Sequence, residues 1–274
     1  MELELRCVVF QRLESGGMMM RKTVILTLAL LGSAGSAFAA DLPANVYTKA
    51  PAVVAPVYNW GGFYIGLNGG GGSSHKCWDI SNFLGVVVPS TAEGCHDATG
   101  GIVGGQLGYR WQTGGWVFGV EAQGDWASLK GSNASLLTAP FTVFTNNTKV
   151  DAIGLFTAQL GYAWNNVLWY VKGGAAVTHD KYNGQILGVT LDSAGESRWG
   201  GAIGTGVEIG FAPGWSVAFE YDHLFMGSRD NTFNFTPAVA PFVGLSRVDN
   251  IRQDVDMGTV RVNYTFGGPR IAVY

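Results

Sequence analysis

Eight segments of the chain alternate residue by residue between apolar side chains and polar or small ones. In the first, FYIGLN, the apolar residues Phe63, Ile65 and Leu67 share one face of an extended chain. A period of two residues is typical of a β-strand with one apolar face. The segments are 63–68, 103–111, 116–126, 156–164, 169–178, 198–211, 215–222 and 259–266. We therefore predict an all-β fold with eight antiparallel strands of about ten residues each.

The connections between these segments alternate between long and short. The three short ones are QTGG at 112–115, NN at 165–166 and APG at 212–214. The four long ones cover roughly residues 73–99, 130–148, 181–196 and 229–253. Every short turn, and both ends of the strand array, therefore fall at one end of the sheet. Bacterial outer-membrane barrels show this asymmetry, so we predict an eight-stranded up-and-down transmembrane β-barrel.

Aromatic residues collect where the strands meet the short turns. Trp111 and Trp116 flank the first turn, and similar pairs flank the other two. Transmembrane barrels carry such a girdle at the membrane–water interface. The alternative, a soluble β-sandwich or barrel, would not confine its aromatic residues to one rim. The predicted girdle consists of Trp60, Trp111, Trp116, Trp164, Trp169, Phe211, Trp215 and Phe266.

Glycine accounts for 41 of the 274 residues and charged residues for only 14%. In the stretch WGGFYIGLNGGGG, which begins at Trp60, seven of thirteen residues are glycine. Glycine weakens strands in water, because it packs nothing and loses much entropy on folding. In lipid every backbone group has to pair internally, so a closed barrel retains glycine-rich strands. Inward glycines would also leave room for large neighbours such as Tyr64 and Tyr170.

The N-terminal 59 residues divide into three parts. Residues 20–39 combine a basic start, an apolar run and the sequence Ala-Phe-Ala, which is the pattern of a cleaved secretory signal peptide. Residues 1–19 carry charges that do not suit a signal peptide, so we interpret them as a spurious extension. Residues 40–59 are rich in proline and alanine and are predicted to form an extended spacer. The barrel is expected at 60–266, followed by a short tail at 267–274.

Charged side chains fall on the face of the strands that is predicted to point into the barrel. An eight-stranded barrel is just wide enough for its own side chains, so charges of opposite sign are expected to pair there. A polar plug is favoured over the alternative, a small water-lined pore. The predicted network consists of Arg110, Glu121, Asp125, Lys172, Arg198, Glu208, Glu220, Asp222 and Arg261.

Two cysteines, Cys77 and Cys95, remain after the predicted signal peptide is removed. An even pair in an exported protein favours a disulfide. With His75 and His96 the two cysteines resemble a zinc site, but disulfide-bonded sulfurs do not bind zinc. We predict no metal and no other cofactor.

Catalysis and nucleic-acid binding find little support in the sequence. Asp222 and His223 are adjacent in a predicted strand, so their side chains point to opposite faces and cannot form a dyad directly. No Walker A, GxSxG or HExxH motif occurs. Removal of residues 1–39 leaves 13 basic against 17 acidic residues, whereas nucleic-acid binding needs a basic surface. We predict a protein that is not an enzyme and does not bind nucleic acid.

Three stretches carry a resemblance to a known family. The spacer DLPANVYTKAPAVVAPVYNW, the segment NWGGFYIGLNGG and the end VRVNYTFGGPRIAVY resemble the small outer-membrane immunogenic proteins of alphaproteobacteria, in the opacity-like "porin family" of β-barrels. The resemblance implies an eight-stranded barrel with surface-exposed loops and no shared catalytic motif. It also implies one of several roles: porin-like protein, antigen or, in some relatives, haemin binder.

These observations predict an integral protein of the outer membrane of a Gram-negative bacterium, with extracellular loops and periplasmic termini. We expect a role in envelope integrity and in surface contact through the loops. The alternatives are a narrow porin for small solutes and a surface receptor for haemin or another ligand. Expected partners are outer-membrane lipid and lipopolysaccharide, the barrel-assembly machinery, and host or environmental ligands at the loops.

Overall fold

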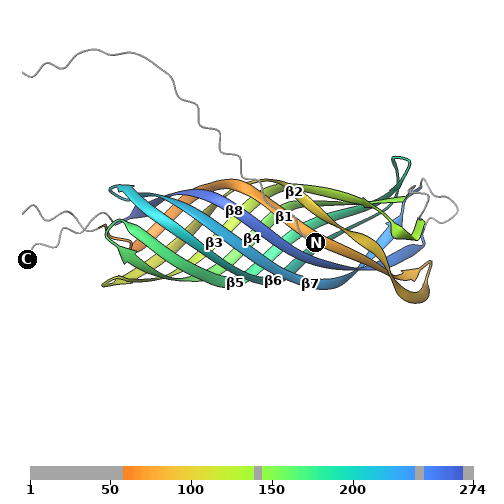
Figure 1. Ribbon diagram of the computed structural model, residues 1–274, viewed down its shortest axis with the longest axis horizontal. Coiled ribbons are helices and arrows are strands. Elements are labelled where there is room, and N and C mark those ends of the chain that lie inside the picture. The colour runs from red at the N-terminus through yellow and green to blue at the C-terminus, as the bar shows by residue number, and fades with distance from the viewer. Residues whose placement is uncertain (1–57, 139–143, 238–243, 268–274) are drawn as a thin grey trace, which may run out of the picture. The chain divides into compact units, whose positions relative to one another are not determined.

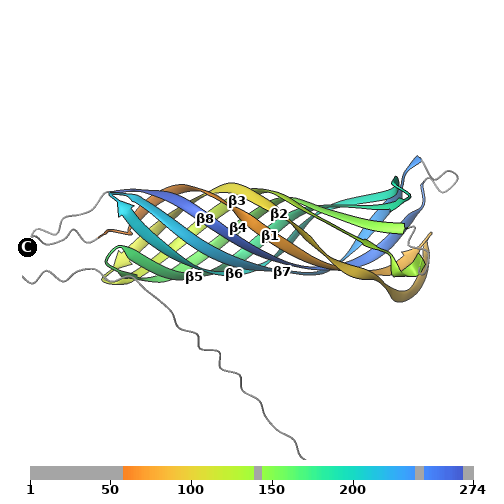
Figure 2. The same cartoon turned by 45° about the horizontal axis from the view of Figure 1, so that its top comes forward.

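The computed structural model describes residues 58–138, 144–237 and 244–267. Within these ranges the chain forms eight antiparallel strands in sequence order, and β8 pairs with β1 to close the ring (Figures 1 and 2). The prediction of an eight-stranded barrel is confirmed. A turn of 3-10 helix, η1 (Leu136–Thr138), follows β3. The strands are β1 (Gly62–Phe83), β2 (Val86–Thr113), β3 (Trp116–Ala134), β4 (Phe144–Trp164), β5 (Val167–Ile186), β6 (Val189–Ala212), β7 (Trp215–Phe235) and β8 (Ser246–Phe266).

The predicted N-terminal extension and signal peptide lie outside the described residues, as do the spacer and the C-terminal tail apart from a few residues. In the part of the chain that the structure describes, no helix is long and apolar enough to cross a membrane.

The strands run well beyond the segments identified in the sequence. They contain 19 to 28 residues. The predicted loops at 73–99 and 181–196 shrink to two residues each, Leu84–Gly85 and Leu187–Gly188. The prediction of long loops there is wrong, because most of these residues extend the barrel as a β-ribbon. The other two predicted loops also shrink, to 135–143 and 236–245.

The short-turn end carries the tight turns at 114–115, 165–166 and 213–214. The ribbon end is the opposite end, where β1 turns into β2 and β5 into β6.

The outer surface of the short-turn half is apolar and lies between two bands of exposed aromatic side chains. Trp116 in the first band and Trp126 in the second are ten residues apart on β3. Ten residues of a strand tilted by about 40° rise about 25 Å, which matches the apolar height of an outer-membrane barrel. We therefore take the segments between the bands as membrane-spanning. The first band contains Trp111, Trp116, Trp164, Trp169, Phe211, Trp215 and Phe266, and the second, absent from the prediction, contains Trp126, Phe156, Trp199 and Phe225.

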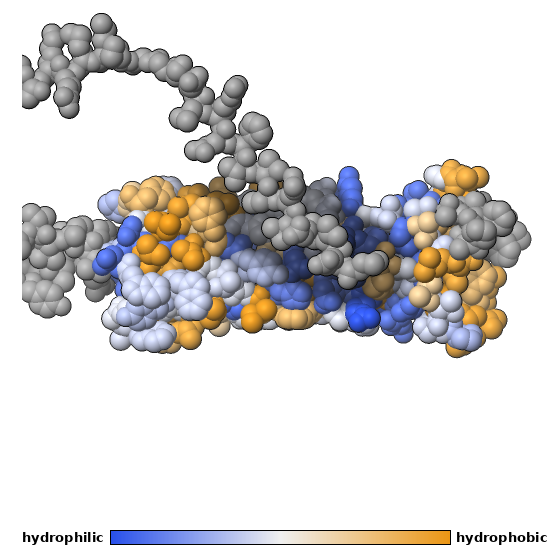
Figure 3. Space-filling view, in the orientation of Figure 1, coloured by the Kyte–Doolittle hydropathy of each residue, from blue (hydrophilic) through white to orange (hydrophobic). Residues whose placement is uncertain are grey.

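Beyond the second band the outer surface becomes hydrophilic, before apolar residues return at the tip of the ribbon end (Figure 3). The alternation persists there with its sense reversed. In β1, His75 is exposed on the outside whereas Trp78 and Ile80 are buried. This pattern is typical of strands that lie beyond the membrane and face water on their outer side.

Trp60 differs from the predicted girdle. Its side chain is fully buried and packs with Val117, Leu168 and Tyr170 inside the short-turn end. Trp60 precedes β1, which begins at Gly62. The period-two pattern of the strand therefore does not fix its direction, and Trp60 closes the lumen instead of facing the membrane interface.

Candidate functional site in the barrel lumen

Buried charges from several strands meet inside the membrane-spanning half. Arg261 of β8 donates hydrogen bonds to Glu121 of β3 and Glu220 of β7. The Nζ atom of Lys172 lies 2.7 Å from a carboxylate oxygen of Glu220 and 3.5 Å from one of Glu121. It also lies 3.2 Å from Asp222. The side chains of these five residues are fully buried, so they form one ion-pair cluster away from water.

A further ion pair lies in the same half of the lumen. The Nη2 atom of Arg110 lies 2.8 Å from Oε2 of Glu208. Ser216 and Asn263 donate to the other oxygen of Glu208 at 2.5 and 3.0 Å. The hydroxyl of Tyr64 connects the pair to the cluster, because its ring lies under Arg110 and its oxygen is 2.6 Å from Glu121. We call the following residues the central network: Arg110, Glu121, Lys172, Glu208, Glu220, Asp222 and Arg261.

Two predicted members of the network lie apart from it. Asp125 points inward and accepts a hydrogen bond from Gln123 at 2.9 Å, but no cation among the described residues lies within ion-pair distance. Arg198 is buried in the ribbon half, where it donates to Glu196 and to the backbone oxygen of Ile251. Position along the strand separates Arg198 from the network, although the inward direction of its side chain was predicted correctly.

An apolar layer lies between the charges of the two halves. It is built from inward side chains of successive strands, among them Leu129, Leu155 and Met257. All its members are buried, and they form one continuous contact cluster. Apolar constrictions of this kind exclude water and ions. The members are Ala98, Ile102, Ala127, Leu129, Val150, Ile153, Leu155, Ala176, Ala202, Leu224, Met226, Val255 and Met257.

Above the apolar layer, the ribbon half contains charges that the sequence-based prediction missed. The Nζ atom of Lys76 lies 2.5 Å from Asp180 and 3.0 Å from Gln253. Burial lowers the pKa of Lys76 to about 8, despite the attraction of Asp180. Lys76 and Gln253 lie in segments that the sequence predicted as loops, and Asp180 lies between a predicted strand and a predicted loop. The alternation of inward and outward side chains in β1 continues through Lys76, Cys77 and Trp78, and this pattern could have identified Lys76 as an inward residue.

A second ribbon-half cluster surrounds Arg247. Its guanidinium lies 2.7 Å from Asp192, 3.0 Å from Glu93 and 3.0 Å from Asp249. It also lies 4.5 Å from the ring centroid of Phe233. Phe233 belongs to a buried apolar group with Trp78, Tyr182 and Ile251. Charged and apolar layers therefore alternate along the lumen.

A pocket of about 620 Å³ lies at the ribbon end. Its walls are mainly apolar, and Arg247, Glu93 and Asp192 supply charged groups. The apolar lining includes Ile80, Phe83, Phe144, Ile186, Leu191 and Phe235.

Comparison with known proteins identifies the family to which this architecture belongs. Residues 25–266 match the family described as outer membrane protein beta-barrel domain. The chain belongs to this family. The resemblance inferred from the sequence is thereby confirmed.

Relatives of this outer membrane β-barrel protein include two immunogenic proteins. A 31 kDa outer-membrane immunogenic protein of Brucella melitensis is 29% identical over 255 residues, covering 89% of this chain and 100% of that protein. A 25 kDa outer-membrane immunogenic protein of Brucella ovis is 27% identical over 216 residues, covering 78% of this chain and 93% of that protein. The solved structure of the outer membrane protein OprG from Pseudomonas aeruginosa aligns over 77% of this chain and 100% of that chain, with 12% identity and a TM-score of 0.46. The family and the relatives indicate the outer membrane of a Gram-negative bacterium.

The cysteines of this outer membrane β-barrel protein form the predicted disulfide. Cys77 of β1 and Cys95 of β2 are directly opposite each other and are bonded. His75 lies close to both sulfurs, but the sulfurs are not free thiolates. His96 points into the lumen, where it lies within hydrogen-bond distance of Asn133 and Thr148. Of the four residues considered for a zinc site, His75 and the two bonded sulfurs therefore lie together, whereas His96 lies apart from them.

The adjacent residues Asp222 and His223 point to opposite faces, as the strand pattern predicted. Asp222 is buried in the lumen next to Lys172. His223 lies on the outer side, 2.7 Å from Asp256. The two side chains thus have separate partners.

Proposed function

We propose that the protein is a sealed outer-membrane anchor that holds a β-ribbon surface outside the cell, with roles in envelope integrity and surface contact. The observation that carries this proposal is the apolar layer across the lumen. A water-filled path would have to cross that layer, and the paired charges fill the space on either side of it. This arrangement favours a structural plug over a narrow porin.

The proposed orientation places the ribbon end outside the cell. Outer-membrane barrels have short turns on the periplasmic side and longer connections outside. In this protein the turns at 114–115, 165–166 and 213–214, the start of β1 and the end of β8 share one end. The ribbon end carries both longer connections, 135–143 and 236–245, beside its two two-residue turns. An epitope tag inserted between Phe235 and Ser246 should bind antibody on intact cells, whereas a tag at Gly114 should bind only after permeabilisation. The reverse pattern would overturn the orientation.

The surface-contact role is supported by the apolar tips of the ribbon. The side chains of Val87 and Leu187 are 82% and 85% exposed. The hairpins FLGV and ILGV each place a leucine at positive φ, Leu84 and Leu187, which is uncommon for a bulky residue. Exposed apolar patches beyond the membrane are typical of interaction sites. We propose that host or environmental ligands contact these tips, and that lipid, lipopolysaccharide and the barrel-assembly machinery contact the barrel wall.

The absence of catalysis is part of the same proposal. The relatives are named as outer-membrane immunogenic proteins. The buried carboxylates of the central network are engaged by Arg110, Lys172 and Arg261 in the lumen. We assign these charges to holding the barrel together.

A second candidate function is a receptor for haemin or another ligand with a large apolar part, and the ribbon-end pocket favours it. Pockets of about 300–1,000 Å³ with apolar walls and a few charges are typical small-molecule sites. Both Leu136 and Leu137 are exposed, but only Leu137 lines the pocket. If the pocket binds apolar ligands, Leu137→Asp should weaken binding of the neutral probe N-phenyl-1-naphthylamine by about tenfold, and Leu136→Asp should not. Equal effects, or no binding at all, would remove this candidate.

A further inference from the structure

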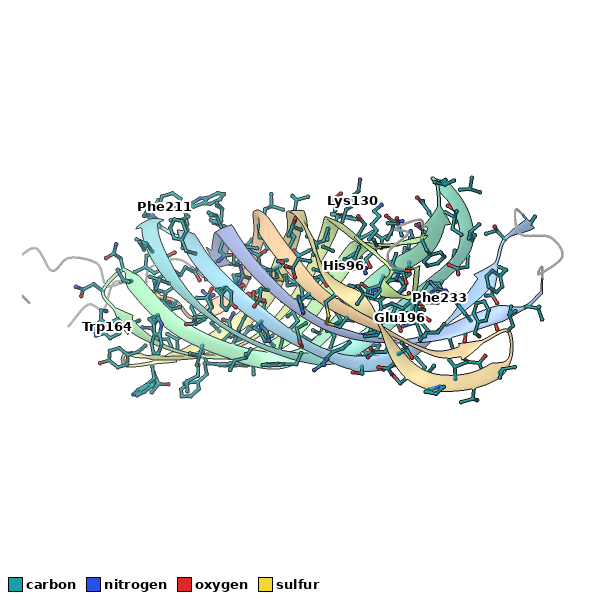
Figure 4. All side chains as sticks on the ribbon, turned by 45° about the vertical axis from the view of Figure 1, so that its right-hand side comes forward. His96, Lys130, Trp164, Glu196, Phe211 and Phe233 are labelled. Carbon is teal, nitrogen blue, oxygen red and sulfur yellow. A yellow bond between two sulfur atoms is a disulfide. The ribbon has the colours of Figure 1, made fainter. Side chains whose placement is uncertain are left out.

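Three lysines stand side by side on the outer surface of the barrel. In the strand register, Lys130 of β3 is directly opposite Lys149 of β4, and Lys149 is directly opposite Lys181 of β5. All three are exposed, and Figure 4 shows Lys130 projecting away from the barrel. We call these residues the lysine row.

The arrangement sets like charges against one another, and Asp151 is the acidic residue that offsets part of this repulsion at Lys149 and Lys181. Like charges directly opposite each other destabilise a sheet, because their Cβ atoms are only about 5 Å apart. Lys181 has a partner, since its Nζ atom lies 2.6 Å from Asp151. Lys130 and Lys149 have no carboxylate within 4.0 Å among the described residues. A negative charge from outside the chain would satisfy them.

The lysine row lies where lipid headgroups meet the barrel. On β3, Lys130 is four residues beyond Trp126 of the second aromatic band, a rise of about 10 Å. Below the row, Trp126 and Phe156 are exposed on the outer wall at 75% and 53%. A molecule bound to the row would therefore have its charged part at the lysines and its apolar part against the aromatic band.

A polar pocket of about 410 Å³ adjoins the lysines. Lys130 and Lys149 contribute to it, and the remaining lining consists of glycine, hydroxyl and amide residues. Amide and hydroxyl groups both donate and accept hydrogen bonds, which suits the hydroxyls of a sugar. The lining residues that carry these groups on the outer side are Ser132, Asn147, Asn183 and Gln185, whereas the hydroxyl of Thr148 is turned to His96 in the lumen.

The opposite side of the ring does not offer the same surface. There the outer side of β8 carries Asp254 and Asp256 beside a single exposed basic residue, Arg252. The basic row is therefore local to β3–β5, and Arg252 provides a matched control on the far side.

We propose that the lysine row binds the phosphate groups of lipopolysaccharide, with its sugars in the adjoining pocket and its acyl chains on Trp126 and Phe156. Ammonium groups at this spacing suit phosphates as point charges. The biological setting rests on the proposed orientation, since lipopolysaccharide surrounds the barrel only on the outer side. The binding chemistry does not rest on it.

The test measures lipopolysaccharide binding to refolded protein in detergent micelles, where orientation plays no part. The double variant Lys130→Gln/Lys149→Gln should bind at least about tenfold more weakly than the unchanged protein. Arg252→Gln should bind normally. Raising the salt concentration should weaken binding by the unchanged protein more than by the double variant, because the variant has lost the charges that salt screens.

Stability provides a check against misfolding. Removal of two opposed like charges should leave the urea midpoint unchanged or slightly raised. The single variant Lys149→Gln, which leaves Lys130 and Lys181 in place, should show an intermediate loss of binding.

Two further ligands identify the chemistry. Dephosphorylated lipopolysaccharide should bind the unchanged protein weakly. Its affinity should be no higher than the affinity of intact lipopolysaccharide for the double variant. Inositol hexakisphosphate, a soluble polyanion, should compete poorly because it lacks acyl chains. Normal binding by the double variant, equal loss in Arg252→Gln, or full competition by the soluble polyanion would each overturn the proposal. The whole-cell tag experiment tests orientation separately.

Discussion

Two tyrosines show how individual residues make this barrel fit together. Tyr64 is directly opposite Gly108, and Tyr170 is directly opposite Gly206. A Cβ atom on either glycine would lie 2.6 Å from the ring of its tyrosine. Each tyrosine therefore lies over a glycine and reaches a carboxylate, so glycine provides the room for large inward side chains.

Gly108→Ala should destabilise the barrel by about 1–3 kcal/mol, because the added methyl group meets both the Tyr64 ring and the backbone oxygen of Val120. Gly124→Ala is the control, since nothing lies within 4 Å of its added Cβ. Urea unfolding of refolded protein measures both. Equal midpoints for the two variants would contradict the packing argument.

Arg261 holds two buried carboxylates, Glu121 and Glu220. Arg261→Ala should therefore cost about 3–5 kcal/mol of unfolding free energy, because it leaves buried charge uncompensated. Glu220→Ala should show a comparable loss. Lys149→Ala, at an exposed position without a close carboxylate, should change stability by less than about 1 kcal/mol. Near-neutral effects of Arg261→Ala and Glu220→Ala would mean that water reaches the network.

Asp249 makes stability at the ribbon end depend on pH. Burial raises the pKa of this carboxyl from 3.8 to about 7, and Glu93 and Asp192 add to the rise while Arg247 opposes it. The folded state holds the proton more tightly than the unfolded state. Protonation of Asp249 therefore stabilises the folded state fully below about pH 4, and this stabilisation is lost as the pH rises to about 7.

Asp249→Asn should abolish the fall in stability between pH 4 and pH 7, because asparagine does not titrate. At pH 8 the variant should be more stable than the unchanged protein, by up to a few kcal/mol, and the difference should vanish near pH 4. Urea midpoints measured across this range test the expectation. A variant that is less stable at pH 8 would show that the pair with Arg247 outweighs the cost of burial.

At the scale of the strands, the sequence predicted the membrane-spanning half well and the ribbon half poorly. The alternation from Trp116 to Trp126 has its apolar side outward, as a lipid-facing strand requires. In the ribbon half the apolar side chains, such as Trp78 and Ile80, point inward and the outer face is polar. These segments therefore resemble polar loops in the sequence. The pairing of particular cations with particular anions could not be predicted from the sequence, because the strand pattern gives the face of a side chain but not the register between strands, which sets its height along the lumen.

The disulfide joins β1 and β2 within the ribbon. Thiol labelling of intact cells without reductant should find Cys77 and Cys95 blocked, and both should label after reduction. Replacing both by serine should weaken the ribbon by roughly 3 kcal/mol, chiefly by freeing its open states. Stoichiometric labelling without reductant would contradict the disulfide.

At the scale of the whole barrel, layers of paired charge alternate with apolar layers from the short-turn end to the ribbon end. Trp60 and Tyr170 close the first end, and Trp78 and Phe233 lie within the ribbon half. The narrow lumen of an eight-stranded barrel leaves little space between them. This arrangement supports the proposal that the barrel is a sealed membrane anchor for the ribbon surface.

Conductance of refolded protein in a planar bilayer tests this account most directly. Folding is first verified by the electrophoretic shift between unheated and heated protein, so that a misfolded preparation without current is not mistaken for a sealed lumen. The sealed lumen predicts no steady current and at most small, infrequent openings. A large, steady conductance that rises in proportion to salt concentration would contradict the sealed lumen and establish a hydrated pore.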